Sequence, residues 1–258
     1  HCELVGLTPQ DALTDAAVWY TQLDQFEKEQ VLETRLYAAL SSGETSIQPR
    51  EYAFLDDLAS SAPAPGGGSA AAHAGAMAAA LVAMVARLTV GRKKYADVKE
   101  RMWQIIEEAE EKRAALTQAV QEDAAAFEGV MAAFKMPKGT SEEQNRRKQA
   151  IQEATLQAAK VPLGVAHMVV DVLDLVAQVA ELGNTNAITD AGTAAALSKA
   201  ALSGASLNVR INLTSLDDQH AAGTLMDELT SLEDRAAILM ERVRTALQDR
   251  GGPALAQF

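Results

Sequence analysis

Apolar side chains recur at helical spacing along most of this chain. From residue 94 to residue 134 they fall three, four or seven positions apart, and no proline interrupts them. That period predicts one long amphipathic helix, which Pro137 and Gly139 end. We expect Pro162 to kink or divide a later helix, because proline lacks a backbone N–H donor. The same period predicts helices at 52–58, at 70–90 up to Gly91, at 141–183 behind a capping box at Ser141–Gln144, from Asp190 to Gly204, and at about 218–249.

The beginning of the chain has a different pattern. Leu4–Leu7 is a short apolar run typical of a strand, and Thr8 followed by Pro9 predicts the start of a helix. A second helix is predicted from Asp24 to about Leu40.

Residues 41–46 are rich in Ser, Thr and Gly and therefore read as a linker, and no strand pattern of consequence follows them. We predict an all-α protein with a domain boundary at residue 45. Its main part, residues 46–258, is an antiparallel helical bundle with long helices, and residues 1–45 form a short strand and helix remnant before it.

Composition narrows the classes of protein that fit. The 258 residues are 48% hydrophobic but only 4% aromatic, and alanine, the best helix former, supplies much of the apolar content. Acidic residues outnumber basic ones by 35 to 23, which gives a formal charge of −12. Nucleic acids and anionic membranes bind basic surfaces, so we expect neither as a partner. With one cysteine, Cys2, and no pattern of a secretory signal, we expect a cytoplasmic protein.

The alanine-rich segment at 70–86 is the stretch that most resembles a membrane span. It is shorter than the roughly 20 residues that a span needs. Four basic residues follow it by position 94. We therefore expect a buried helix whose small side chains let neighbouring helices approach closely.

The glycine-rich segment Pro63–Ser69 is a candidate ligand site. Glycines at the start of a helix leave backbone N–H groups free and let a ligand approach the main chain closely. Gly66, Gly68 and Ala71 also fit the loose dinucleotide pattern G-x-G-x-x-A. No strand precedes that pattern, which argues against a nucleotide cofactor. The alternative is a Pro/Gly hinge that binds nothing.

Asn208, Arg210 and Asn212 alternate with Val and Ile. In a helix such side chains point in different directions, whereas a wide turn or an unwound segment would aim them together. Two amides and a guanidinium suit a heterocyclic amide or a carboxylate. A solvent-exposed helix edge is the alternative.

Two carboxylates stand among alanines and other apolar residues, Asp123 and Asp190. A carboxyl group that faces an apolar interior keeps its proton to higher pH, as an acid/base catalyst working near neutrality requires. Each also has a structural alternative, as a surface acid or, for Asp190, as a helix cap. The four histidines share no ligand spacing, so we expect no metal.

Five segments occur in a fixed order along the chain: 63–72, 88–91, 123–127, 184–192 and 208–212. Their residues and order resemble the cyclodeaminase/cyclohydrolase family, whose best-known members are the C-terminal domain of formiminotransferase-cyclodeaminase and methenyltetrahydrofolate cyclohydrolase. The resemblance spans about residues 49–245. Residues 3–13 also resemble the end of the formiminotransferase domain that precedes the cyclodeaminase domain in the bifunctional enzyme.

The resemblance implies a helical homodimer, with an upstream formiminotransferase domain as a further partner. It implies as substrate a tetrahydrofolate one-carbon adduct, with or without a polyglutamate tail, and no cofactor beyond it. The implied enzyme is an ammonia-lyase of histidine degradation, formimidoyltetrahydrofolate cyclodeaminase. N10 of 5-formimidoyltetrahydrofolate attacks the formimidoyl carbon, and ammonia leaves to give 5,10-methenyltetrahydrofolate. Two alternatives stay open: a methenyltetrahydrofolate cyclohydrolase, and a non-catalytic helical module for oligomerisation.

Residue roles follow from the matched motifs. We hypothesise that Asp123 is the acid/base and Asp190 its electrostatic partner. For a polyglutamate tail, the basic clusters at 92–94 and 146–148 are candidates, with solvated helix faces as the alternative. The residues expected to hold the folate are Pro65, Gly66, Gly67, Gly68, Ser69, Asn208, Arg210 and Asn212.

Overall fold

The structure, a computed structural model, describes residues 10–23, 26–27, 30–32 and 53–255. The chain divides into two compact units, residues 1–53 and 54–258. In the first unit the described helix is α1 (Gln10–Thr21). The strand predicted at Leu4–Leu7, the helix start at Thr8, most of the helix predicted at 24–40 and the boundary at residue 45 lie outside the described residues.

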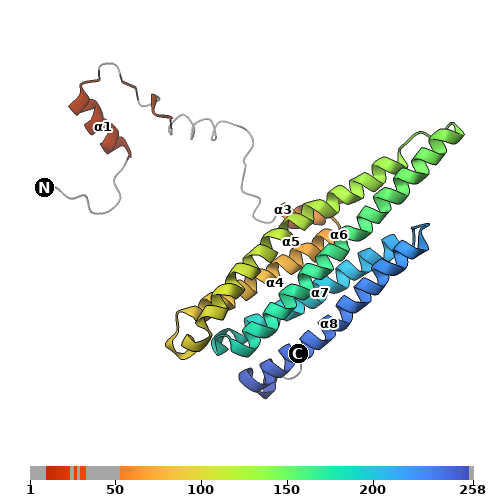
Figure 1. The fold of residues 1–258 in the computed structure, drawn as a ribbon. Coiled ribbons are helices and arrows are strands. Elements are labelled where there is room, and N and C mark those ends of the chain that lie inside the picture. Colours follow the sequence, from red (N-terminus) through yellow and green to blue (C-terminus); the bar gives the residue numbers. More distant parts are fainter. Residues whose placement is uncertain (1–9, 24–25, 28–29, 33–52, 256–258) are drawn as a thin grey trace. The chain divides into compact units, whose positions relative to one another are not determined.

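Five long helices dominate the part of the chain from residue 53 onward (Figure 1). Helix α4 packs against α5 and α7, and α6 contacts the four other long helices. The described residues contain no strand, so the predicted all-α class is confirmed for them. In chain order the elements are α3 (Ala53–Leu58), α4 (Gly67–Val90), η2 (Lys93–Val98), α5 (Lys99–Phe134), α6 (Ser141–Leu182), η3 (Thr185–Ala187), α7 (Ile188–Leu213), α8 (Gln219–Gly251) and η4 (Pro253–Leu255).

Local sequence signals account for several helix ends. Helix α4 stops at Gly91, as predicted, and Asp218 caps α8 by accepting hydrogen bonds from two backbone N–H groups of its first turn. The capping box of α6 lies one residue earlier than predicted, with Thr140 as the cap and Glu143 as its reciprocal partner. Both residues still follow the expected pattern of a hydroxyl and a carboxylate three positions apart.

The structure differs from the sequence predictions at three helix boundaries. Helix α6 is not divided at Pro162, which leaves the kink predicted there as the alternative, and α7 continues past Gly204 to Leu213, so the helix end predicted at Gly204 is wrong. Gly204 serves close packing instead, since a Cβ there would lie 3.1 Å from the Cβ of Ala71 on α4. The helix predicted from residue 94 begins as the 3-10 turn η2, and the α-helix starts at Lys99.

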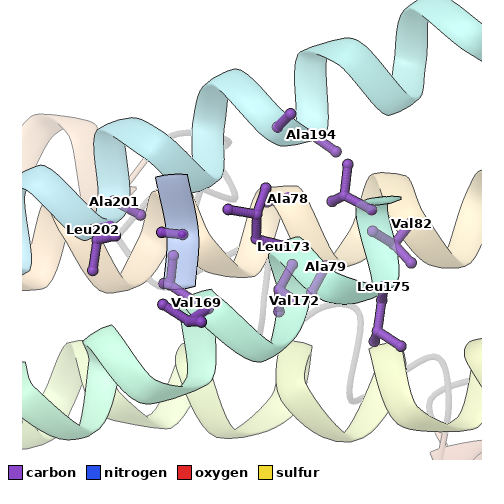
Figure 2. Close-up of a cluster of buried hydrophobic side chains, with 14 of the residues drawn as sticks. Ala78, Ala79, Val82, Val169, Val172, Leu173, Leu175, Ala194, Ala201 and Leu202 are labelled. Atoms are coloured by element: carbon purple, nitrogen blue, oxygen red, sulfur yellow. The ribbon is translucent and has the colours of Figure 1, made fainter. Parts of the chain in front are cut away.

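The core is built mainly from small and β-branched side chains. Ala78 and Val82 of α4, Val169 and Leu173 of α6 and Ala201 of α7 gather in one buried cluster (Figure 2). Small residues allow the helix backbones to approach closely, so the predicted role of the alanine-rich segment is confirmed. Helices α4 and α6 are long and apolar enough to cross a membrane, but 61% and 67% of their apolar windows are buried inside the bundle.

Candidate active site

One end of the bundle brings most of the predicted site residues into a single pocket. The first turn of α4, the second half of α5, the first half of α6 and the last turns of α7 form its walls. Its volume is about 350 Å³. The lining residues are Pro63, Ala64, Gly66, Gly67, Gly68, Asp123, Ala126, Phe127, Val130, Ala158, Asn208, Ile211 and Asn212.

Asp123 is the one carboxylate among these lining residues. It is half-buried on α5, and its Oδ2 accepts a hydrogen bond of 2.8 Å from the hydroxyl of Ser69. Ser69 is fully buried in the first turn of α4 and does not itself line the pocket. The serine therefore fixes the orientation of the carboxylate that lines the pocket.

Gly68 explains how the carboxylate can approach α4 so closely. A Cβ at this position would lie 2.2 Å from Oδ1 of Asp123, closer than two such atoms can come. Gly66 is the N-cap of α4 and offers no side-chain cap, so the N–H groups of the first turn have no side-chain acceptor there. Gly66, Gly67 and Gly68 all line the pocket, and their contact with a ligand stays a prediction.

Asn208 and Asn212 lie one helical turn apart on α7 and both line the pocket. The amide nitrogen of Asn208 donates to the carbonyl of Gly204, and that of Asn212 donates to the carbonyls of Ala158 and Asn208. Because the nitrogens face these carbonyls, each amide turns its oxygen away from them. The side-chain oxygens of both residues accept no hydrogen bond from the described residues, so they remain available as acceptors.

Arg210 does not line the pocket. Helix α7 is regular at this point, so Arg210 points about 200° away from Asn208 and from Asn212. Its guanidinium makes two hydrogen bonds to Glu233 of α8, of 2.9 and 2.7 Å, which hold the pKa of the Glu233 carboxyl below its ordinary value. The expectation that a turn or unwound segment aims all three polar side chains together is therefore wrong.

Asp190 also lies elsewhere in the subunit. It sits half-buried in the first turn of α7, 18 residues before Asn208 on the same helix, a rise of about 27 Å. At that position the positive end of the helix dipole stabilises the negative charge of Asp190. Within one chain the structure does not bring Asp190 to Asp123, and its role as electrostatic partner stays a prediction.

Sequence reasoning missed the apolar walls of the pocket. Phe127 and Val130 follow Asp123 at four and seven positions on α5, and Ile211 lies between the two asparagines on α7. Phe127 and Val130 could have been predicted, because their spacing places them on the same face of the helix as Asp123. Ala158 could not, because it belongs to α6 and no motif in the sequence surrounds it. Pro65, predicted as a contact, is not among the lining residues and follows a cis peptide bond after Ala64.

Acidic and histidine side chains do not gather in the described part of the chain. No group of three or more His, Cys, Asp or Glu residues there has the arrangement of a metal site. The expectation of a site without a metal stays a prediction.

Comparison with known proteins gives a consistent result. A family model described as formiminotransferase-cyclodeaminase matches residues 52–231. Methenyltetrahydrofolate cyclohydrolase of Methylorubrum extorquens is 46% identical over 197 residues, which cover 76% of this chain and 95% of that protein. Formimidoyltransferase-cyclodeaminase of Rattus norvegicus is 31% identical over 275 residues, covering 96% of this chain but 50% of the rat protein.

A solved structure is similar as well. The crystal structure of formiminotetrahydrofolate cyclodeaminase from Thermotoga maritima matches with a TM-score of 0.69 and 35% sequence identity. The match covers 76% of this chain and 94% of the Thermotoga chain. These relatives are enzymes of folate metabolism, and their names divide between a cyclohydrolase and cyclodeaminases.

Proposed function

The chain belongs to the formiminotransferase-cyclodeaminase family, and from this premise we propose that it is a formimidoyltetrahydrofolate cyclodeaminase. The observation that carries the proposal is the single pocket carboxylate, Asp123, held by a buried serine between apolar walls and free amide oxygens. The reaction needs one group that accepts a proton and returns it. The pocket supplies one such group.

The proposed step moves a single proton through Asp123. N10 of the substrate bonds to the carbon of the cationic formimidoyl group, and the carboxylate takes the proton that N10 releases. The neutral tetrahedral centre then receives that proton on its amino nitrogen and expels ammonia. The electron pair on N5 completes the 5,10-methenyl cation, so charge and atoms balance. No electrons are transferred, and we propose that the reaction needs no cofactor beyond the folate. General acid/base catalysis of this kind typically contributes about 10²–10⁴ in rate.

The polar groups of the pocket suit a tetrahydropterin ring. Such a ring carries several N–H groups, and the oxygens of Asn208 and Asn212 are acceptors for them. The Asp123 carboxylate faces the same space and favours a cationic amidine or methenyl carbon electrostatically. Phe127, Val130 and Ile211 give the ring apolar surface to pack against.

The extent of the matches favours an upstream formiminotransferase domain, and through it the cyclodeaminase of the bifunctional proteins. The rat and Sus scrofa formimidoyltransferase-cyclodeaminases match 96% and 93% of this chain, against 76% for the Methylorubrum cyclohydrolase. This agrees with residues 3–13 resembling the end of a formiminotransferase domain, which we propose as an upstream partner. The second candidate, a cyclohydrolase, is favoured by the 46% identity to the Methylorubrum protein.

One experiment separates these activities. The protein is mixed with 5-formimidoyltetrahydrofolate or with 5,10-methenyltetrahydrofolate, and the near-UV methenyl absorbance and free ammonia are followed. The cyclodeaminase produces methenyl absorbance and ammonia in equal amounts from the first substrate. Loss of absorbance from the second substrate above the uncatalysed rate, without ammonia production from the first, would identify a cyclohydrolase. No change with either substrate would contradict both.

We also propose that the enzyme is a homodimer through the outer face of α4 and α7. Exposed apolar side chains line both helices, including Met77, Met84 and Leu88 on α4 and Leu207 on α7. Apart from His73, α4 carries no charged or titratable side chain before Arg87. A long uncharged face complements itself about a two-fold axis, so a second copy is the occupant that fits it. Light scattering should give twice the chain mass, and Met84→Glu should give the monomer; a wild-type monomer would contradict this.

A further inference from the structure

The Asp123 pocket has no basic side chain among its lining residues. A folate carries at least one glutamate, whose carboxylates are negatively charged at neutral pH. The chain as a whole carries a formal charge of −12, so such a ligand needs cations close to it. Arg210 of α7 is already paired with Glu233 of α8. Within one chain the pocket therefore lacks a group that its proposed ligand requires.

Three consecutive cations lie at the opposite end of α4. Arg92, Lys93 and Lys94, the 92–94 cluster, line a hollow of about 380 Å³ together with Tyr95 and residues 184–186. All three are exposed, and none forms an ion pair with another residue in the part of the chain that the structure describes. No carboxylate lines this hollow. The 92–94 cluster is therefore available to an anion from outside the chain.

One chain cannot bring the pocket and the 92–94 cluster together. Asp123 packs against Gly68 in the first turn of α4. In the last turn of α4, the hydroxyl of Thr89 accepts a hydrogen bond from the backbone N–H of Asn184, which lines the hollow of the 92–94 cluster. Gly68 and Thr89 are 21 residues apart on the helix, which corresponds to about 32 Å. This separation is longer than a folate with one glutamate.

The two hollows lie at the two ends of α4, in line with its outer face. Helix α4 packs between α5 and α7. Residues of α5 and α7 also form the walls of the Asp123 pocket, next to the first turn of α4, and the 92–94 cluster follows its last turn. Between them runs the face proposed above for the homodimer, where Ala80 of α4 and Ala196 of α7 are exposed near the middle. A two-fold axis perpendicular to α4 at that point exchanges the two ends of the helix.

The distribution of charge favours this orientation of the two copies. A two-fold axis parallel to α4 would place the two 92–94 clusters side by side, where their like charges repel. With the perpendicular axis, each cluster lies at the end of α4 where Phe54 of α3 stacks on His73. Helix α3 carries two exposed carboxylates there, Asp56 and Asp57. Opposite charges then meet at both ends of the interface.

Building on the proposed function and the proposed homodimer, we propose that the active site is shared between two chains. The partner subunit's 92–94 cluster lies beside the Asp123 pocket and binds the glutamate carboxylates of the folate. The pterin ring stays with Asp123 and the asparagines of the first chain. A monomer has no complete site.

Binding tests the contact without an activity assay. Isothermal titration calorimetry compares 5-formyltetrahydrofolate with 5-formyltetrahydropteroate, which lacks the glutamate. The wild-type protein should bind the first compound about ten-fold more tightly, because charge-assisted contacts hold its carboxylates. The cluster variant, Arg92→Gln/Lys93→Gln/Lys94→Gln, should bind both compounds with the same weak affinity.

The matched control removes three exposed cations elsewhere, as Lys135→Gln/Lys138→Gln/Arg244→Gln, and should keep the wild-type preference. Circular dichroism and light scattering check that the fold and the dimer are intact in both variants. A cluster variant that keeps the preference would overturn the inference, as would a monomeric wild-type protein. Failure of the wild type to bind either compound would overturn the folate pocket as well.

Mixed dimers test whether the cluster acts on the partner's pocket. A chain with Asp123→Asn is refolded together with an equal amount of the cluster variant. One site of each mixed dimer then combines an intact Asp123 with an intact cluster from the other chain. Turnover at low KM, of whichever folate substrate the wild type consumes, should return to about one quarter of the wild-type rate.

A cluster that acts on the pocket of its own chain forms no such site, so absence of low-KM turnover in the mixture would overturn the shared site. A wild-type protein that binds 5-formyltetrahydrofolate with the expected preference but turns over neither substrate would contradict the proposed function alone. The binding comparison would then still support the contact between the 92–94 cluster and the glutamate.

Discussion

The hydroxyl of Ser69 donates a hydrogen bond to Oδ2 of Asp123 across 2.8 Å, and this contact joins the first turn of α4 to the second half of α5. The two residues are 54 positions apart in sequence. The bond fixes the orientation of the carboxylate at the pocket wall, against Gly68 of α4. A catalytic acid/base held in this way needs no reorientation during the reaction.

Ser69→Ala tests this positioning role. We expect kcat to fall by about 10–100-fold while KM changes little, because the carboxylate remains present but loses its fixed orientation. Steady-state kinetics on the formimidoyl substrate measures both constants. Ser203→Ala, which removes an exposed hydroxyl bonded only to the carbonyl of Lys199, is the matched control. Equal kcat values for Ser69→Ala and wild type would show that the bond does not position Asp123.

Gly68→Ala tests the close approach of the carboxylate to α4. The added methyl group would lie 2.2 Å from Oδ1 of Asp123, so we expect the carboxylate to be displaced and the activity to be lost. Overpacking of this kind costs about 1–3 kcal/mol in the free energy of unfolding. Gly129→Ala on α5 is the control, since a Cβ there meets nothing within 4 Å. It should be neutral or stabilising by about 0.5–1 kcal/mol. Full activity in Gly68→Ala would contradict the described geometry.

Arg210→Ala separates stability from folate binding. Arg210 pairs with Glu233 outside the Asp123 pocket, so we expect the folate Kd to change less than about three-fold. The partly exposed pair contributes up to about 1 kcal/mol to the free energy of unfolding. Because the folded-state pKa of Glu233 is lowered, that contribution is full at pH 7. The contribution of the pair is lost as the pH falls below 4.5, the ordinary pKa of a glutamate, and then through the lowered pKa of Glu233 in the folded protein. Denaturant unfolding at pH 7 and pH 3 measures it, and a ten-fold weaker folate affinity would instead place Arg210 in folate binding.

The hydroxyl of Tyr95 should lose its proton at a lower pH than an ordinary tyrosine. Hydrogen bonds from the side chain and backbone of Thr185, with Lys94 nearby, lower its pKa to about 8. Absorbance of tyrosinate should therefore show one of the four tyrosines ionising near pH 8, and Tyr95→Phe should remove that step. Since the folded-state pKa is lowered, ionisation of Tyr95 stabilises the fold increasingly from pH 8 to pH 10 and not below. A titration with no step below about pH 9.5 would contradict the described contacts.

Apolar spacing predicts the helices well where it is continuous. The motifs around Asp123 and the glycines are recognisable in the sequence, and the fold brings these residues to one pocket, where α7 places Asn208 and Asn212 on one face. Their roles stay predictions. In a single sequence Gly204 indicates a helix end, because its packing against Ala71 of α4 is visible only in the fold. The position of Arg210 outside the pocket cannot be predicted either, because its partner, Glu233, lies on a helix with no matching motif.

The central claim is that Asp123 transfers the proton in a folate reaction, and Asp123→Asn tests it most directly. Single-turnover formation of 5,10-methenyltetrahydrofolate from the formimidoyl substrate is followed by its near-UV absorbance, beside Glu128→Gln, which changes an exposed carboxylate on the same helix. We expect a rate about 10²–10⁴ lower for Asp123→Asn, with an unchanged helical circular dichroism spectrum, and a wild-type rate for Glu128→Gln. A rate for Asp123→Asn within a factor of about three of wild type would contradict it.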